Sequence, residues 1–178
     1  MLLRASLVDQ FGANVSGRAI AFNVNGALAG SSVTGSGGIA VTAFTPLLAA
    51  ASYLTSASFG GDSLYVESTG SGSISVARKA SSVTYTGALT GGPNKTITLS
   101  AVLKDATGKP LAGELIVFQL GTQTATATTN DSGVGSTYLT LKPKNGKYPL
   151  TATWVPSGPD MDHYNGSAAS ASFSLQSR

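Results

Sequence analysis

The sequence predicts an all-β protein built from two similar domains in tandem. Short runs in which apolar and polar residues alternate recur along the chain, and Gly, Asp, Asn or Pro separates them. This is the pattern of strands with one buried face, joined by turns. The second half repeats the first at a shift of about 96 residues. Charged residues make up only 11%, and the Ser and Thr that replace them suit strands with a polar, uncharged outer face.

The repeat is clearest in one turn. Asp105-Ala-Thr-Gly-Lys-Pro-Leu-Ala-Gly113 and Asp9-Gln-Phe-Gly-Ala-Asn-Val-Ser-Gly17 both have Gly three residues after Asp and again five residues later. Asp with Gly three residues on is typical of a type I turn in which the Asp side chain accepts backbone hydrogen bonds. Alignment outward from this pair brings core and turn positions into register, with insertions only in predicted turns. This indicates an internal repeat.

We place the second domain at 79–178 and expect seven strands in it. The alternating runs that predict them are 81–86, 96–104, 116–120, 123–129, 137–141, 148–154 and 171–175. Seven short strands with turns between them are the pattern of a complete immunoglobulin-like β-sandwich. Tyr148, near the start of the sixth run, fits the tyrosine corner, in which a Tyr hydroxyl bonds back across the turn to the backbone.

The first domain, at 1–78, follows the same order but has room for only one strand, at 1–8, ahead of its Asp9 turn. The second domain has two strands ahead of Asp105. We therefore expect the first sandwich to lack its N-terminal strand A and to start at strand B, with an unpaired edge and an uncovered strip of core. Two explanations stay open: Met1 is a truncation inside a longer array, or another chain supplies the strand. Asn25-Gly26 predicts a tight hairpin.

Three stretches resemble the repeats of bacterial immunoglobulin-like (Big, group 3-type) domains. They are Leu54-Thr-Ser-Ala-Ser-Phe-Gly-Gly-Asp-Ser-Leu-Tyr65, Lys104-Asp-Ala-Thr-Gly-Lys-Pro-Leu-Ala-Gly113 and Thr126-Ala-Thr-Thr-Asn-Asp-Ser-Gly-Val134. The resemblance implies a non-catalytic structural or spacer module of a secreted or cell-surface bacterial protein. The alternatives are an adhesin-type module that binds a glycan or a protein, and a subunit of an extracellular assembly completed by a donated strand. The implied partners are neighbouring immunoglobulin-like domains of the same or another chain.

Composition argues against other classes of function. The net charge is only +3 and the basic residues are dispersed, whereas nucleic-acid binders carry a basic patch or stripe. The chain has no Cys, which excludes thiol catalysis, disulfides and Cys-ligated zinc. No apolar stretch approaches the roughly 20 residues that span a bilayer. We therefore expect neither nucleic-acid binding nor a membrane span.

Catalysis and metal binding have little support in the sequence. Asp160, Asp162 and His163 form the one cluster of acidic residues with a His. They fall in a loop four residues longer than its counterpart in the first domain, and we expect a polar turn there, because metal sites need several convergent ligands. A Ser-His-Asp triad would have to use His163, and no G-x-S-x-G motif is present. We expect no enzyme activity, catalytic residue or cofactor.

Two features bear on binding. A sugar platform needs exposed aromatic side chains, and Tyr85 and Tyr138 are the candidates for one. Alternation places six other aromatic residues on core-facing positions: Phe22, Tyr53, Phe59, Phe118, Tyr148 and Trp154. The loop Pro46-Leu-Leu-Ala-Ala-Ala51 is apolar, whereas the matching loop at 142–147 is polar. An exposed apolar loop indicates a contact with another molecule, but this loop could equally fold over its own domain.

Overall fold

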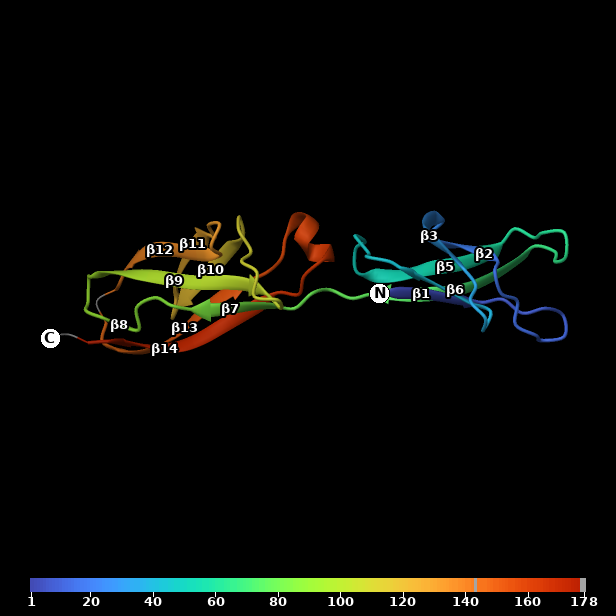
Figure 1. The fold of residues 1–178 in the computed structure, drawn as a ribbon. Coiled ribbons are helices and arrows are strands. Elements are labelled where there is room, and N and C mark those ends of the chain that lie inside the picture. The colour runs from blue at the N-terminus through green and yellow to red at the C-terminus, as the bar shows by residue number, and fades with distance from the viewer. Residues whose placement is uncertain (143, 177–178) are drawn as a thin grey trace. The chain divides into compact units, whose positions relative to one another are not determined.

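The computed structural model describes residues 1–142 and 144–176, and it confirms the all-β, immunoglobulin-like fold class (Figure 1). Part of the polar loop at 142–147 lies outside the described residues. Backbone contacts divide the chain into two compact units, Met1–Ala77 and Arg78–Arg178. We call these unit 1 and unit 2.

Unit 2 is a sandwich of a three-stranded sheet, in the order β12-β9-β7, and a five-stranded sheet, in the order β11-β10-β13-β14-β8. Among the described strands of unit 2, β8 pairs in parallel with β14, and the other strand pairs are antiparallel. Sequence reasoning missed β8, because two residues in a Gly-rich stretch give no alternation. The strands are β7 (Ser81–Tyr85), β8 (Thr90–Gly91), β9 (Thr96–Asp105), β10 (Leu115–Leu120), β11 (Gln123–Thr128), β12 (Val134–Thr140), β13 (Gly146–Trp154) and β14 (Ser167–Leu175).

The core of unit 2 lies between these two sheets. In β9 every second side chain is buried, from Ile97 through Leu103. This is the face that the period of two predicted. Burial of such a side chain stabilises the fold by about 1.5–3 kcal/mol. The largest fully buried side chains are Trp154, Phe118, Phe173, Leu99, Leu103, Ile116, Leu141 and Leu150.

Unit 1 has the same two layers with fewer strands. A two-stranded sheet, β1-β4, faces a four-stranded sheet in the order β3-β2-β5-β6. In the described part of the chain, no strand holds the place on β1 that β7 holds on β9. The strands are β1 (Leu2–Ser6), β2 (Ala19–Val24), β3 (Ala27–Val33), β4 (Ile39–Ala43), β5 (Ala51–Phe59) and β6 (Ser68–Val76).

The predicted turns are confirmed. Asp9 Oδ1 accepts hydrogen bonds from the backbone N–H groups of Phe11 and Ala13, both at 2.9 Å. Asp105 Oδ1 accepts the same pair of bonds, at 2.8 and 3.0 Å, in unit 2. Between β2 and β3, Asn25 and Gly26 have φ angles of 50° and 79°, as a type I′ hairpin turn requires.

Both units also contain a tyrosine corner. The hydroxyl of Tyr148 donates to the carbonyl of Lys144 at 2.9 Å, which confirms the prediction for unit 2. The hydroxyl of Tyr53 donates to the carbonyl of Ala49 at 2.9 Å. Each bond ties the loop ahead of its strand, β13 or β5, to the start of that strand.

The one helix among the described residues is the short 3₁₀ segment η1 (Gly158–Asp162). No helix in this part of the chain has the length and apolar character needed to cross a membrane.

Candidate functional site

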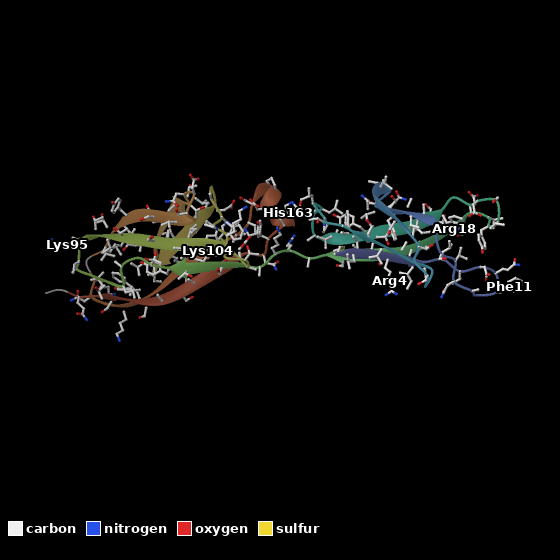
Figure 2. The ribbon with its side chains drawn as sticks, viewed as in Figure 1. Arg4, Phe11, Arg18, Lys95, Lys104 and His163 are labelled. Atoms are coloured by element: carbon white, nitrogen blue, oxygen red, sulfur yellow. The ribbon has the colours of Figure 1, made fainter. Side chains whose placement is uncertain are left out.

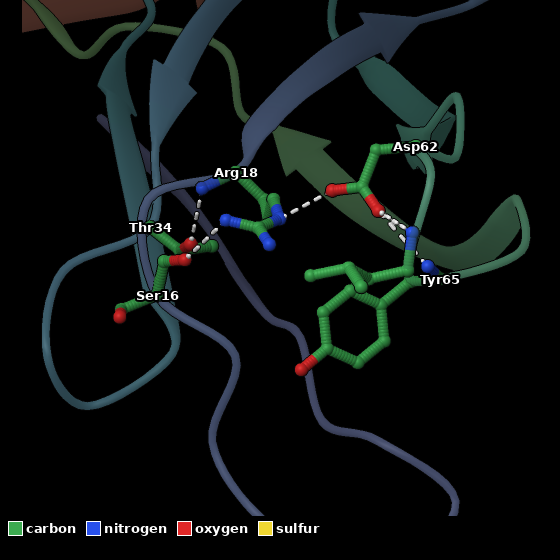
Figure 3. A network of polar contacts seen from close by, with 6 residues as sticks. Ser16, Arg18, Thr34, Asp62 and Tyr65 are labelled. Atoms are coloured by element: carbon green, nitrogen blue, oxygen red, sulfur yellow. Dashed lines mark hydrogen bonds and ion pairs between the residues drawn. The ribbon is translucent and has the colours of Figure 1, made fainter.

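The loop after β5 is fixed to the start of β2 by an ion pair. Arg18 Nε lies 2.5 Å from Asp62 Oδ2, and the Arg18 guanidinium lies 5.4 Å from the centre of the Tyr65 ring (Figure 3). The backbone N–H of Arg18 donates to Thr34 Oγ1 at 3.0 Å, and Nη1 donates to the carbonyl of Ser16 at 3.2 Å. The Arg18 side chain thus connects the segment ahead of β2 to the loop that holds Asp62 and Tyr65, while its backbone N–H bonds to Thr34.

The Asp62 carboxylate also holds its own loop. Its Oδ1 accepts backbone hydrogen bonds from Leu64 at 2.8 Å and Tyr65 at 2.9 Å. The hydrogen bond from Leu64 is the largest influence lowering the pKa of Asp62, followed by those from Tyr65 and the Arg18 cation, while partial desolvation opposes them. The Phe-x-Gly-Asp-x-x-Tyr stretch that carries the family resemblance is therefore a loop-stabilising motif in this structure.

Unit 2 has the opposite charge at the equivalent position. Glu114, which corresponds to Arg18, also donates its backbone N–H to a Thr hydroxyl, Thr129 Oγ1, at 2.9 Å. Its carboxylate accepts a 2.8 Å hydrogen bond from Trp154 Nε1. Burial raises the pKa of Glu114, the adjacent Asp160 carboxyl raises it further, and the bond from Trp154 opposes both. An ion pair in unit 1 is thus replaced by two neighbouring carboxyl groups.

The predicted acidic and His cluster is divided in the structure. Asp160 lies in η1 beside Glu114, and Asp162 is exposed at the end of η1. The backbone carbonyl of His163 accepts a hydrogen bond from Lys79 N at 2.7 Å. Among the residues that the structure describes, no three or more His, Cys, Asp or Glu side chains converge as metal ligands would.

Tyr85 and Tyr138, the two candidates for a sugar platform, have different environments. Tyr85 packs edge-on against Phe118, with ring centres 6.3 Å apart, and its hydroxyl donates to the carbonyl of Ala88. Burial raises the pKa of Tyr85 to about 12. Tyr138 is 76% exposed. Tyr85 is therefore part of the core, and Tyr138 by itself does not form a platform for a sugar.

An exposed apolar surface lies at one end of unit 1. We call it the apolar end surface and define it as Val8, Phe11, Leu64 and Val66. Phe11 and Val66 are 84% and 88% exposed, and Figure 2 shows Phe11 extending from its loop. The four residues rim a pocket of about 350 Å³. Exposed apolar patches with a hollow are typical of interaction sites.

The apolar end surface has no counterpart in unit 2. The aligned positions there are Lys104, Thr107, His163 and Asn165. Sequence reasoning missed the surface, because its residues come from two loops 50 or more residues apart along the chain. The one signal in the sequence was Phe11, an aromatic residue in a turn whose repeat carries Thr107.

The apolar loop at 46–51 serves its own domain in part. Leu48 packs against the core of unit 1, and Ala49 accepts the hydrogen bond of the tyrosine corner. Leu47 is 93% exposed. Self-packing therefore explains Leu48, and Leu47 stays a candidate for a contact with another molecule.

Solved structures of bacterial proteins include several that match this chain over most of its length. The chain matches the crystal structure of invasin, a bacterial integrin-binding protein, with a TM-score of 0.51 and 15% identity, over 99% of this chain and 36% of that one. It also matches a 1.5-MDa bacterial ice-binding adhesin, with a TM-score of 0.41 and 12% identity, over 91% of this chain and 54% of that one. A Ca²⁺-stabilised adhesin of an Antarctic bacterium gives a TM-score of 0.41 and 14% identity, over 99% of this chain and 44% of that one.

The similarity to invasin supports the immunoglobulin-like fold. The chain spans 36% of the length of the invasin chain. No protein-family model matches the sequence, and no curated protein matches it either. The group 3 assignment made from the motifs stays a prediction.

Proposed function

We propose that this chain is a non-catalytic structural module, a pair of immunoglobulin-like domains that acts as a spacer in a secreted or cell-surface bacterial protein. The observation that carries the proposal is the short junction between two separately cored units. Unit 1 ends its last strand at Val76, and Lys79 is already bridged to Tyr164 of unit 2. Only Ala77 and Arg78 remain between these fixed points.

The junction is fixed to unit 2 by backbone hydrogen bonds on both sides of Lys79. Its N–H donates to the carbonyl of His163 at 2.7 Å, and its carbonyl accepts from the N–H of Asn165 at 2.9 Å. A connection of two free residues without Gly or Pro restricts relative motion more than a flexible linker does. A spacer needs this property in order to carry whatever lies beyond it.

One further finding supports this class of function. The fold similarity to invasin agrees with an extracellular or cell-surface location and with neighbouring immunoglobulin-like domains as partners.

NMR relaxation of the whole chain tests the spacer proposal. We expect the two units to tumble with one common correlation time. A variant with Gly-Ser-Gly-Ser inserted between Ala77 and Arg78 should separate the two correlation times, because the inserted residues are flexible. Independent tumbling of the units in the unmodified chain would contradict a spacer role.

A second candidate function is an adhesin-type binding module for a glycan or a surface protein, and the apolar end surface favours it. We expect such a ligand to be captured through Phe11 and Val66. Phe11→Ser with Val66→Ser should then abolish binding in an array of glycans and surface proteins. The matched control is Leu54→Ser, because Leu54 is 76% exposed on β5 outside the apolar end surface. Absence of any saturable ligand would leave the spacer role alone.

A further inference from the structure

A groove of about 320 Å³ separates β1 from β5 and β6 in unit 1. Leu3 and Ala5 of β1 line one side, and Gly70 and Gly72 of β6 line the other. Phe22 of β2 also lines it. The groove therefore opens between the two sheets, directly onto the core of unit 1.

One side of the groove is an edge of β1 that no other described strand pairs with. Met1 and Phe44 exchange both backbone hydrogen bonds, at 2.8 and 2.9 Å, and Leu7 N donates to the carbonyl of Gly38 at 2.8 Å. Alternate residues of an antiparallel strand direct their backbone groups to opposite sides. Between these contacts, the backbone N–H and C=O groups of Leu2, Arg4 and Ser6 therefore point away from β4.

Unit 2 shows what occupies the equivalent space. There β7 pairs antiparallel with β9, from Ser81 opposite Asp105 to Tyr85 opposite Ala101. Its Val83 side chain is buried and only 8% exposed. The chain then crosses to the other sheet, where β8 pairs with β14. A single extended segment thus covers the edge and closes the core.

The absence of this segment leaves the core of unit 1 exposed along one strip. Ala57 of β5 is partly exposed, whereas its counterpart Ala152 is fully buried. Ile74 of β6 is also partly exposed, whereas its counterpart Phe173 is fully buried. The strip that is open to solvent is the one that β7 and β8 cover in unit 2.

The side of the groove on β6 is wider than its counterpart in unit 2. Gly70 and Gly72 stand where β14 has Ala169 and Ala171. A Cβ on Gly70 would meet no atom within 4 Å. The groove therefore has room for an inward side chain larger than Val83.

We propose that the groove of unit 1 binds one extended polypeptide segment as an added β-strand. The segment runs antiparallel to β1, bonds to its free edge and inserts apolar side chains from alternate residues over Gly70. Its chemistry is that of β7, rich in β-branched, hydroxyl and aromatic residues, with a larger apolar residue at the position of Val83. β-strand addition of this kind gains affinity from main-chain bonds and specificity from side-chain pockets.

The groove favours a single strand over a second copy of unit 1. Two β1 edges paired about their centre would place Arg4 of one copy opposite Arg4 of the other, and like charges at directly opposed positions are destabilising. The space also lies between the layers of one sandwich, where a whole sheet does not fit. This inference goes beyond the proposed function and holds for a spacer and for an adhesin alike.

A synthetic peptide with the sequence of residues 80–91 is the probe, titrated by fluorescence anisotropy into the complete chain. We expect saturable binding of one peptide per chain. Hydrogen exchange should slow at the amides of Leu2, Arg4 and Ser6 when the peptide is bound. The matched control peptide carries Val83→Asp and Tyr85→Asp and should bind at least about tenfold more weakly, because both inward side chains become charged. A peptide with Val83→Leu should bind more tightly than the original.

Two protein variants locate the site. Gly70→Val fills the groove, whereas Gly60→Val adds the same side chain outside the groove, where a Cβ also has no atom within 4 Å. Far-UV circular dichroism checks that both variants fold. We expect Gly70→Val to weaken binding of the original peptide about tenfold or more, because overpacking a strand site is unfavourable. Gly60→Val should leave the affinity within about twofold, since surface changes have small effects.

Several outcomes would overturn the proposal. One is the absence of saturable binding at peptide concentrations up to about 1 mM, because a dissociation constant of about 1 mM is the weakest affinity that would support the proposal. Others are equal affinities of the Gly70→Val and Gly60→Val variants, or protection of amides outside β1. Protection of β1 that rises with protein concentration in the absence of peptide would assign the edge to a second copy.

Discussion

Strands β1 and β9 have closely similar sequence patterns, and they differ in what lies beside them. In unit 2, β9 lies between β12 and β7, and its inward residues Leu99, Ala101 and Leu103 are fully buried. In unit 1, β4 is the one described strand that pairs with β1, and the inward residue Ala5 of β1 is partly exposed. Alternation therefore fixes which face of a strand is apolar, whereas burial of that face depends on the neighbouring strand.

The two units also differ at the residue just ahead of β2 and at its counterpart just ahead of β10. The aligned positions Arg18 and Glu114 make the same backbone hydrogen bond to a Thr hydroxyl, at 3.0 and 2.9 Å. Their side chains then meet Asp62 and Asp160, as an ion pair in one unit and as two carboxyl groups in the other. One backbone position therefore accepts either charge, provided that the opposing loop supplies a suitable partner.

The largest expected effect is a difference between the two cores in the stability that is lost when a buried Phe is replaced by Ala. Phe118→Ala should destabilise unit 2 by about 3–5 kcal/mol, because it leaves a cavity in a closed core. Phe22→Ala, at the aligned position in unit 1, should cost less, since Phe22 also lines the open groove. Urea unfolding followed by Trp154 fluorescence reports unit 2, and circular dichroism reports both units. Equal losses would mean that the groove does not weaken the core of unit 1.

The next largest effect is expected at Asp105 of the repeated turn, and it depends on pH. The hydrogen bond from the Thr107 side chain is the largest influence lowering the pKa of Asp105. A depressed pKa adds stability above the ordinary Asp pKa, and this stability is lost as the pH falls through the depressed value. Asp105→Asn should therefore destabilise unit 2 at neutral pH and reduce its sensitivity to acid. The measurement is urea unfolding across an acidic pH series, and parallel curves for both proteins would contradict the prediction.

A smaller effect of opposite sign is expected at Glu114. Because burial and Asp160 raise its pKa, the folded state favours the protonated carboxyl. That contribution is full below the ordinary Glu pKa and is lost as the pH rises through the raised value. Glu114→Gln should abolish this loss, so the variant gains stability relative to the wild type as the pH increases. The same difference at every pH would show that ionisation of Glu114 has no part in it.

The smallest effect is expected for the ion pair in unit 1. Arg18→Gln removes the pairing with Asp62, and ion pairs open to solvent contribute little. The thermal midpoint of unit 1 should fall slightly at low salt, and the difference should shrink in high salt, because salt screens exposed charges. The matched variant is Arg4→Gln, since Arg4 makes no ion pair among the described residues. An equal fall in both variants would remove the pair as the cause.

Local chemistry explains which features were predictable. The strands followed from alternation, and the Asp9 and Asp105 turns from the bonds that an Asp side chain makes to the next few residues. The tyrosine corner of Tyr148 was predictable for the same reason, because its partner Lys144 is four residues away. Strand β8 was missed, because its position depends on β14 and not on its own two residues.

The all-β class, the repeat, the turns and the single strand ahead of the Asp9 turn could all be read from the sequence. Each of these is written in residues close together along the chain or in the alignment of one half on the other. Three other features became visible in the folded structure alone: Glu114 lies beside Asp160, Phe11 and Val66 share one surface, and a groove opens beside β1. These features join segments about 45 or more residues apart, so they depend on how loops and sheets pack, which local patterns do not specify.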